Sequence, residues 1–423
     1  MMKVARIVGA LLSLSLVLAA CGGADNDGGS GGSGKLATGP GFDGKTITLG
    51  ILSPLSGPVA VIGEPLTAGN QVFFKALNAK GGIDGKYKVK LDTEDTIYES
   101  DTTVQKYNKI KNDVVLFTQM LGTAPTLATL PSLKRDKITA APASLDAFWV
   151  REPNLLPVGG PYQTQAINAI DYYVAEGGGK GKRVCFMGND DAYGEAGLQG
   201  VEFAAKENGF ELASTQKLKS GDKDVTGQIQ RLARAKCDAV FLTSLPSDTG
   251  TILGTAAKLK FAPRWILQSP AWIGPLADSP LKPYLEQTTW VASEGPEWGD
   301  RSVPGMKAML DDIDRIRPEQ KPDYYFSFGY VQGQAVESLL KKAVELGDLS
   351  REGIQKALRE MENVESGGLF GEYDYGPAAE RKPPVVTTIF KVNTSKPISL
   401  EALKRDHTSD AASKFEFTVR AGT

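Results

Sequence analysis

The sequence predicts an α/β fold of two lobes, each built around a doubly wound parallel sheet. Short apolar runs alternate with longer amphipathic segments from Lys45 onward, which is the pattern of successive β-α-β units. The alternation starts again after Gly159-Gly160. A chain of 423 residues also exceeds the usual size of one hydrophobic core. We therefore expect two cores joined by crossover segments.

The first series begins with a predicted strand at 46–52, which is rich in β-branched and apolar residues. A helix is predicted at 64–80, because its apolar residues recur at helical spacing and Gly81-Gly82 ends the run. The same alternation then predicts strand 88–92, helix 101–111, strand 114–118, helix 124–135 and strand 138–141.

The second series repeats this pattern. It predicts helix 163–176, strand 183–187, helix 195–208, strand 211–217, helix 225–235, strand 239–243, helix 249–260 and strand 265–267. Two further helices, 324–346 and 351–362, come after this series is complete, so part of the chain is expected to return to the first lobe. Strands 370–375 and 385–392 would then complete the other lobe.

Three crossovers follow from this order, near Gly160, Ser293 and Gly368. Such multiple connections permit two lobes to close around a ligand. The expected organisation is a signal peptide at 1–20, a flexible tether at 21–44, lobe 1 at 45–160 plus 293–367, lobe 2 at 161–292 plus 368–403, and a polar C-terminal tail at 404–423. Within that tail, the alternating residues 415–419 could instead form an edge strand.

The N-terminal residues have the features of an export signal. Lys3 and Arg6 precede an apolar run at 7–20, which is shorter than the ~20 residues of an uncleaved membrane anchor. The last residues before Cys21, Leu18-Ala19-Ala20, resemble the lipobox of bacterial lipoproteins, which implies that Cys21 is acylated. The Gly- and Ser-rich segment that follows is expected to be a flexible tether beside a membrane.

Composition argues against several classes of function. The chain has 48 Lys and Arg against 50 Asp and Glu, so nucleic acid is not an expected partner. Its one histidine, His407, lies in the terminal segment, so we expect no Ser-His-Asp triad, no histidine-ligated metal and no cofactor. The acidic clusters 92–95 and 190–191 lack calcium-loop spacing and are expected to cap helices or face solvent.

Two cysteines remain in the predicted mature domain. Cys185 lies in a predicted strand and Cys237 lies just before a strand that is expected to be its neighbour. Free buried thiols are the simpler interpretation, because unpaired cysteine is often buried. The sequence leaves open whether the two side chains pair.

Polar loops follow three strands of the first lobe at one sheet edge, where open α/β sheets bind ligands. Ser56 lies after the first strand, Leu121-Gly122-Thr123 after the third, and Ala143-Ser144 after the fourth. Gly122-Thr123 also leads into a helix, so its amides and the Thr123 hydroxyl can donate to a carboxylate or carbonyl. Ordinary helix capping is the alternative.

Several motifs resemble those of the leucine-type periplasmic binding proteins of ABC importers. The resemblance rests on segment 53–57, then Gly63-Glu64 and segment 78–85, and on segment 190–194, and it extends from about residue 45 to 397. It implies a type I periplasmic-binding fold with the ligand in the cleft between the lobes. The Gly122-Thr123 and Ala143-Ser144 loops would hold a carboxylate, and Tyr193 would close from the second lobe or else pack at the start of its helix.

The chain also departs from this family's amino-acid binders. They place a carboxylate after the strand that corresponds to 265–267, where this chain has 269–272, Ser-Pro-Ala-Trp. Ile62 replaces an aromatic residue that the family has at this position. The loop that is rich in tyrosine in the family reads Ser244-Leu245-Pro246 here. Since a buried ammonium without a counter-charge is costly, we expect a ligand without a free α-ammonium. Trp272 would be a flat apolar wall or a core residue, and Glu294 or Glu297 could supply the missing carboxylate.

The resemblance implies a function without catalysis. It implies an exported, monomeric lipoprotein on the outer face of the cytoplasmic membrane that passes a small, partly apolar organic solute with a carboxylate or amide to ABC permease subunits. One alternative is a sensor that presents its closed state to a receptor. A second alternative is an enzyme that uses Asp or Tyr chemistry in the cleft.

Overall fold

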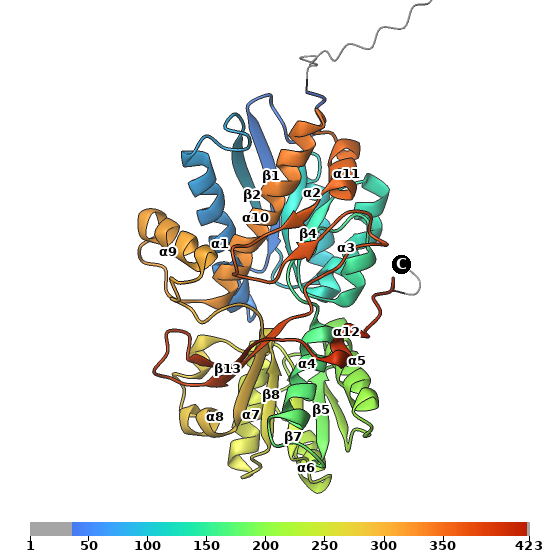
Figure 1. Cartoon of the computed structure of the whole chain (residues 1–423), viewed down its shortest axis with the longest axis vertical. Coiled ribbons are helices and arrows are strands. Elements are labelled where there is room, and N and C mark those ends of the chain that lie inside the picture. Colours follow the sequence, from blue (N-terminus) through green and yellow to red (C-terminus); the bar gives the residue numbers. More distant parts are fainter. Residues whose placement is uncertain (1–35, 421–423) are drawn as a thin grey trace, which may run out of the picture. The chain divides into compact units, whose positions relative to one another are not determined.

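Two large sheets and one two-stranded sheet form within residues 36–420, the part of the chain that this computed structural model describes (Figure 1). The first sheet has the strand order β2-β1-β3-β4, and all of its neighbouring strands are parallel. Its strands are β1 (Thr46–Ser53), β2 (Lys88–Asp95), β3 (Leu116–Leu121) and β4 (Ala140–Ala143). We call this sheet and the helices packed on it the first lobe.

The second sheet has seven strands in the order β13-β12-β9-β8-β7-β5-β6. They are β5 (Val184–Asn189), β6 (Thr215–Leu218), β7 (Ala239–Thr243), β8 (Arg264–Gln268), β9 (Thr289–Ser293), β12 (Thr387–Val392) and β13 (Leu400–His407). The strands from β6 to β9 run parallel, whereas β12 and β13 add an antiparallel edge. This sheet organises the second lobe, and the predicted α/β fold class is confirmed.

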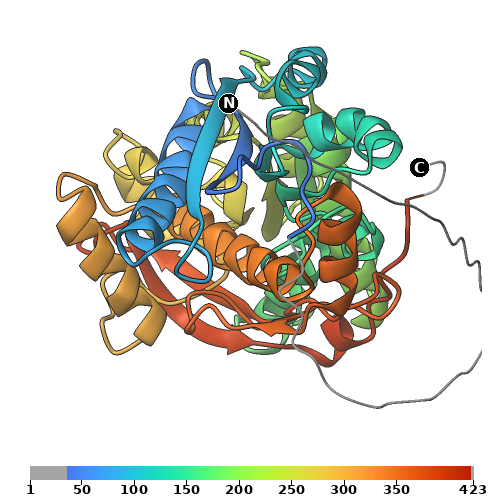
Figure 2. The ribbon, with the colours of Figure 1, turned by 90° about the horizontal axis from the view of Figure 1, so that it is seen from above.

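The late helices pack on the first lobe, as the element order predicts. This lobe carries α1 (Ala60–Ala79), α2 (Ser100–Ile110), α3 (Thr123–Asp136), α9 (Pro304–Ile316), α10 (Tyr324–Glu345) and α11 (Arg351–Glu360). Helices α1 and α10 lie side by side (Figures 1 and 2). A Cβ at Gly69 or Gly329 would lie 2.1 or 1.9 Å from a backbone oxygen of the other helix, so glycine is required at this crossing.

The second sheet has an apolar core on each face. Alternate residues of its strands separate to opposite faces, with Met187 and Val240 on one side and Phe186 and Phe241 on the other. The covering helices are α4 (Tyr162–Ala175), α5 (Ala192–Glu207), α6 (Thr226–Arg234), α7 (Pro246–Lys258), α8 (Lys282–Thr288) and the short α12 (Asp410–Ser413). The 3-10 turns are η1 (Ala147–Arg151), η2 (Ser269–Ala271) and η3 (Gly274–Leu276).

Several elements differ from the sequence-based expectation. Strands β9 and β13 and helices α8 and α9 were not predicted. Helix α1 begins at Ala60, four residues before the predicted start at residue 64. The helix contains Pro65, and because proline lacks an N–H it is typical of the first turn, so the sequence suggests a later start. The expected strand at 370–375 is reduced to β11 (Tyr373–Asp374), paired with β10 (Asn363–Val364).

The third crossover lies later than the predicted position near Gly368. The Tyr375 hydroxyl donates to the carbonyl of Pro157, and the buried Arg381 guanidinium donates to the carbonyls of Glu152 and Leu155. These contacts hold the chain on the first lobe well beyond Gly368, and it reaches the second sheet only at β12. The other bounds assigned to the lobes remain a prediction.

The expected polar tail at 404–423 is partly ordered structure. Strand β13 continues through residues 404–407, and α12 packs on the second lobe with α4 and α5. No strand forms at 415–419. Instead, the Phe415 ring packs on Phe203 of the second lobe, and Arg151 of the first lobe donates from Nε to the carbonyl of Phe417 at 3.2 Å. The C-terminal segment therefore contacts both lobes.

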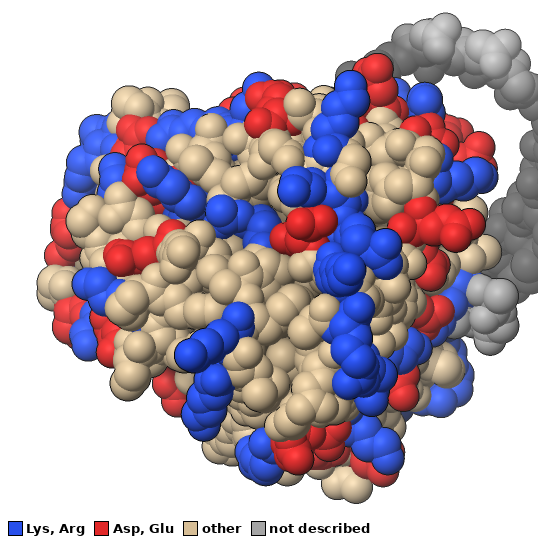
Figure 3. Space-filling model, turned by 90° about the horizontal axis from the view of Figure 1, so that it is seen from below, with Lys and Arg blue, Asp and Glu red and all other residues tan. Residues whose placement is uncertain are grey.

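The predicted signal peptide and Cys21 lie outside the described residues. The last part of the predicted tether is described and is held on the first lobe, since Ala37 exchanges backbone hydrogen bonds with Gly347 and Leu349. Within residues 36–420, no helix combines the length and the apolar character needed to cross a bilayer. One face of the molecule shows Lys and Arg side chains interspersed with Asp and Glu (Figure 3).

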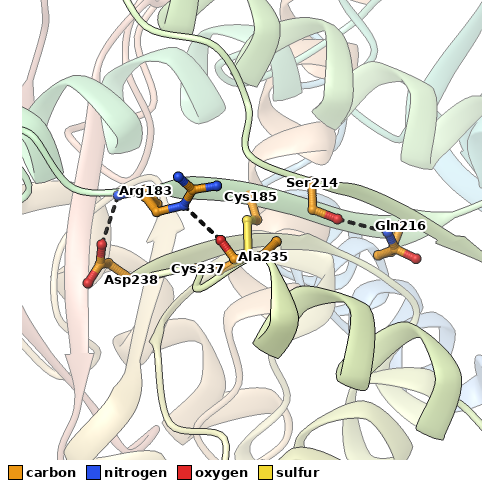
Figure 4. Close-up of a disulfide and its surroundings, with 7 residues drawn as sticks. All are labelled: Arg183, Cys185, Ser214, Gln216, Ala235, Cys237 and Asp238. Atoms are coloured by element: carbon orange, nitrogen blue, oxygen red, sulfur yellow. Dashed lines mark hydrogen bonds between the residues drawn. A yellow bond between two sulfur atoms is a disulfide. The ribbon is translucent and has the colours of Figure 1, made fainter.

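Cys185 and Cys237 form a disulfide, which corrects the simpler expectation of free thiols (Figure 4). Cys185 lies in β5, and Cys237 precedes the neighbouring strand β7. Strand pairing brings the two residues together, with 5.8 Å between their Cα atoms. Both side chains are buried, so the bond crosses an apolar core of the second lobe.

This bond predicts a measurable loss of stability on its removal. It links residues 52 positions apart, and closing a loop of this length in the unfolded chain corresponds to about 4 kcal/mol of unfolding free energy. We expect the double variant Cys185→Ala and Cys237→Ala to lose a similar amount in urea unfolding. The variant should not respond to reductant, whereas the parent protein should. Equal stability of the reduced and oxidised parent would contradict the prediction.

Candidate ligand-binding site

A mostly apolar cavity lies where the two lobes meet. Its volume is about 40 Å³, so the space between the side chains is narrow. The first lobe contributes Val59, Ile62, Leu66, Tyr98, Leu121, Gly122, Thr123, Ala143, Ser144, Leu145, Tyr324, Tyr325 and Phe328, and the second contributes Tyr162, Tyr193, Leu245, Ser269 and Pro270.

The start of α3 forms a polar part of the first-lobe wall. Gly122 precedes this helix with φ 109° and has no side chain that could cap the first N–H groups. Thr123 follows and is 2% exposed. Helix N-termini carry unpaired N–H groups and a partial positive charge, so this end can receive an anion or a carbonyl oxygen.

Tyr98 covers Gly122 from the loop after β2. A Cβ built at Gly122 would lie 2.8 Å from Cε2 of the Tyr98 ring, so only glycine allows the ring to lie this close. Tyr98 and its neighbour Ile97 have φ values of 64° and 47°, which are strained for bulky residues. Asp95 supports the loop by accepting from the amides of Leu55 and Ile97 at 2.9 Å each.

Ser144 adds a second hydroxyl to this wall. Its Oγ accepts a hydrogen bond from Nε1 of Trp149 at 3.1 Å, so its own hydrogen remains available to donate. Trp149 is fully buried in the first lobe and fixes the position of the serine. The wall therefore offers hydroxyl donors at two neighbouring loops.

The second lobe contributes a pair of tyrosines. Tyr193 lies in the first turn of α5, and its ring packs against Tyr162 of α4 with 5.0 Å between ring centroids. Asp191 fixes this turn by accepting from the amide of Gly194 at 2.9 Å. The buried Tyr193 hydroxyl has no hydrogen-bond partner within the described residues. An unpaired buried hydroxyl at a cavity wall is a group that a bound ligand can satisfy.

Helix α10 links the two walls. The Tyr325 hydroxyl donates to the carbonyls of Ser269 and Trp272 at 3.1 and 2.7 Å, which fixes the η2 turn of the second lobe against the first. Tyr324 and Phe328, from the same end of α10, also line the cavity. The start of α10 therefore closes one side of the site.

None of the described residues that line this cavity is charged. Burial raises the pKa of Tyr98, Tyr193 and Tyr324 above the ordinary tyrosine value, so their hydroxyls stay protonated at neutral pH. The site is therefore an apolar space with neutral hydrogen-bond donors, and its wall includes the start of α3. It suits an uncharged or anionic polar group attached to an apolar body.

Eight of the ten predicted site residues line this cavity, and they come from both lobes: Ile62, Leu121, Gly122, Thr123, Ala143, Ser144, Tyr193 and Leu245. Ser56 and Trp272 do not line it. The Ser56 hydroxyl is exposed and donates to Asp95 at 2.6 Å, so it stabilises its own loop. The η2 turn directs Trp272 into the core of the second lobe, where it is 4% exposed, and Ser269 and Pro270 line the cavity in its place.

Sequence reasoning missed four tyrosines of the cavity. Tyr98 follows β2 at the same sheet edge as the predicted loops, so the rule that found Thr123 could have found it. Tyr162 follows the first crossover directly. Tyr324 and Tyr325 come from a helix that was predicted to start at residue 324, but no local pattern in the sequence indicates that its first turn lies against the cavity.

Glu294 and Glu297, which could have replaced the missing carboxylate, do not line the cavity. Both oxygens of Glu294 accept backbone hydrogen bonds, from Gly160 at 2.7 Å and from Gly371 at 2.8 Å. Glu297 accepts from the amide of Ala402 at 2.9 Å and pairs with Lys396. Among residues 36–420, no group of three His, Cys, Asp or Glu side chains could hold a metal ion.

Comparisons with known proteins agree on one family. The family model described as "Periplasmic binding protein" matches residues 46–396. A Leu/Ile/Val-binding protein of Rhizobium johnstonii is 26% identical over 210 residues, which are 49% of this chain and 56% of that protein. A Leu/Ile/Val-binding protein of Citrobacter freundii is 26% identical over 50% of this chain and 58% of its own length. The chain thus spans little more than half the length of these relatives.

Solved structures match over most of the chain. The fatty acid ABC transporter substrate-binding protein from Thermomonospora curvata superposes with a TM-score of 0.84 and 25% identity, over 91% of this chain and 98% of that one. A branched chain amino acid ABC transporter structure from Thermus thermophilus with bound valine gives a TM-score of 0.74 at 18% identity, over 89% of this chain and 99% of that one. The second likeness shows the fold alone.

The contact between Gly122 and Tyr98 predicts the effect of a single methyl group. We expect Gly122→Ala to lower the unfolding free energy by about 1–3 kcal/mol, because it adds strain at a positive φ and displaces Tyr98. Gly44→Ala is the matched control, since Gly44 has φ 96° but nothing within 4 Å of a new Cβ. Urea unfolding measures both variants. Equal losses would show that the contact with Tyr98 contributes nothing.

Proposed function

The chain belongs to the periplasmic binding protein family, and on that premise we propose that it is the substrate-binding component of an ABC importer for a small apolar carboxylic acid. The observation that carries the substrate class is the absence of any charged side chain from the described wall of the cavity. The family's members are solute-binding proteins, so the proposed activity is capture and release without chemical change.

The carboxylate of the ligand would bind at the start of α3. The uncapped N–H groups of this helix, the Thr123 hydroxyl and the Ser144 hydroxyl lie on one wall. A carboxylate that accepts several such bonds is stabilised in its ionised form without a cation. The Tyr193 hydroxyl would add a donor from the other lobe, which supports closure of the two lobes around the ligand.

The apolar body of the ligand would occupy the rest of the narrow cavity. Val59, Ile62 and Leu66 of the first lobe and Leu245 of the second supply aliphatic surface. Burying apolar area contributes roughly 25 cal/mol per Å². The narrow space favours a slender chain, and a structural relative at 25% identity is named as the substrate-binding protein of a fatty acid ABC transporter. Both points support an unbranched or lightly branched acid.

Branched-chain amino acids are the second candidate, because the curated relatives are named for binding Leu, Ile and Val. The described cavity wall lacks a negatively charged partner for their ammonium group, and Glu294 has both oxygens occupied by backbone amides. Stripping water from an unpaired ammonium costs several kcal/mol. The free acid avoids this cost, so we favour it.

The setting of this activity is also part of the proposal. The sequence motif at Cys21 supports a lipid anchor on the outer face of the cytoplasmic membrane, and the family supports ABC permease subunits as partners. A monomer that offers its closed form to the permease is the simplest arrangement. The alternative is a sensor that presents the same closed form to a receptor.

The substrate class predicts an order of affinities. Isothermal titration calorimetry should compare leucine and phenylalanine with their deaminated acids, 4-methylpentanoate and 3-phenylpropanoate, and with octanoate. We expect each acid to bind at least about tenfold more tightly than its amino acid, because the ammonium finds no counter-charge. Tighter binding of the amino acids would reject the acid and favour the second candidate. Turnover of any ligand would contradict the proposal of simple capture.

The role of the α3 N-terminus predicts a local effect on binding. Thr123→Val keeps the side-chain volume but removes one hydroxyl donor. We expect it to weaken octanoate binding by about 1.5–3 kcal/mol, the usual value of a hydrogen bond to a charged group. Ser132→Ala, near the other end of the same helix, is the control and should bind as the parent does. Parent-like affinity of Thr123→Val would contradict this role.

A further inference from the structure

One buried carboxylate joins segments that lead between the lobes. Glu294 follows β9 directly and begins the second crossover. Its Oε2 accepts from the amide of Gly160, on the first crossover, and its Oε1 accepts from the amide of Gly371, on the segment that leads to the third. Glu294 is 2% exposed. This single side chain therefore binds two backbone amides that are separated from it by 134 and 77 positions in the sequence.

The surrounding backbone is shaped to admit this carboxylate. A Cβ at Gly159 would lie 2.8 Å from Oε2 of Glu294, and a Cβ at Gly371 would lie 3.4 Å from Oε1. The same Cβ at Gly371 would lie 2.5 Å from Cβ of Pro384, on the third crossover. Glycine therefore lets the three connections converge around the carboxylate.

Rotation of one lobe against the other must change the geometry of these connections. Glu294 follows β9 of the second lobe, whereas Gly371 is held on the first lobe and Gly160 lies on the first crossover. A hinge motion therefore cannot leave both hydrogen bonds of the carboxylate unchanged. We propose that protonation of Glu294 controls the hinge. The lobes close with uptake of a proton at Glu294 and open as its ionised carboxylate becomes hydrated. This regulation rests on the lobe closure in the proposed function.

The charges around Glu294 set the direction of this effect. Burial raises the pKa of Glu294 from 4.5 to about 7, and this exceeds the opposite effect of the bonds from Gly160 and Gly371. Asp406, on β13, adds a further negative charge that raises it. Tyr324, on α10, interacts with the Glu294 charge but is itself neutral. The described groups that face Glu294 therefore supply no positive charge that would hold it ionised.

The linkage fixes the pH range. Glu294 has the raised pKa only when it is buried, so protonation stabilises the buried arrangement relative to a hydrated one. This stabilisation is complete below pH 4.5 and is lost as the pH rises to about 7. Each pKa unit by which the two arrangements differ changes their population ratio by up to about tenfold. The closed form should thus be more populated at pH 5 than at pH 8.5.

The test needs no ligand. NMR spectra of the full domain labelled with 15N-glycine should show the amide signals of Gly160 and Gly371 titrating with one shared midpoint above pH 5.5. Small-angle X-ray scattering of the same samples should show a larger radius of gyration at pH 8.5 than at pH 5. In Glu294→Gln, which is neutral at every pH, both changes should disappear. Glu297→Gln, three residues further on the same crossover, should behave as the parent.

Independent titration of the two glycine signals, or an unchanged radius across this range, would overturn the proposal. A Glu294→Gln protein that responds to pH as the parent does would overturn it equally. The parent measurements stand alone if this variant does not fold. Because no ligand is present, these outcomes are separate from the calorimetry: failure of every acid to bind would reject the proposed substrate and leave the hinge result intact.

Discussion

The direction of the parallel strands is the constraint on which the rest of the structure depends. In each lobe, a helix returns the chain so that the next strand runs the same way, and the loops after successive strands collect at one edge. Thr123 follows β3 and Ser144 follows β4 in the first lobe, while Tyr193 follows β5 and Leu245 follows β7 in the second. Those two edges face the same cavity, so the site is built from the ends of strands in both lobes.

This constraint explains what the sequence predicts well. The period of each apolar run indicates its element type, and strand direction then places the following loop at the binding edge. Gly122-Thr123 and Ala143-Ser144 could be located in this way without knowing any contact. Tyr193 and Leu245 came from the family resemblance instead, which supplied the second wall.

The remainder depends on contacts between distant residues. Trp272 was expected as a candidate wall, but the short η2 turn reverses its direction into the core. The pairing of Cys185 with Cys237 requires β5 and β7 to be neighbours, which the sequence suggests but does not establish. Arg381 holds the chain on the first lobe through hydrogen bonds to carbonyls more than 220 residues earlier, so the third crossover comes later than predicted. No local sequence pattern indicates these hydrogen bonds.

The C-terminal segment has a practical consequence for any study of this protein. Its Arg420 forms an ion pair with Glu195 of the second lobe and lies over the ring of Phe148 in the first. A fluorescent reporter attached close to Arg420 would lie beside the seam between the lobes. The N-terminal side of Ala37, which is held on the first lobe alone, is the safer place for purification and immobilisation handles. The C-terminal position is better suited to a sensor that reports lobe movement.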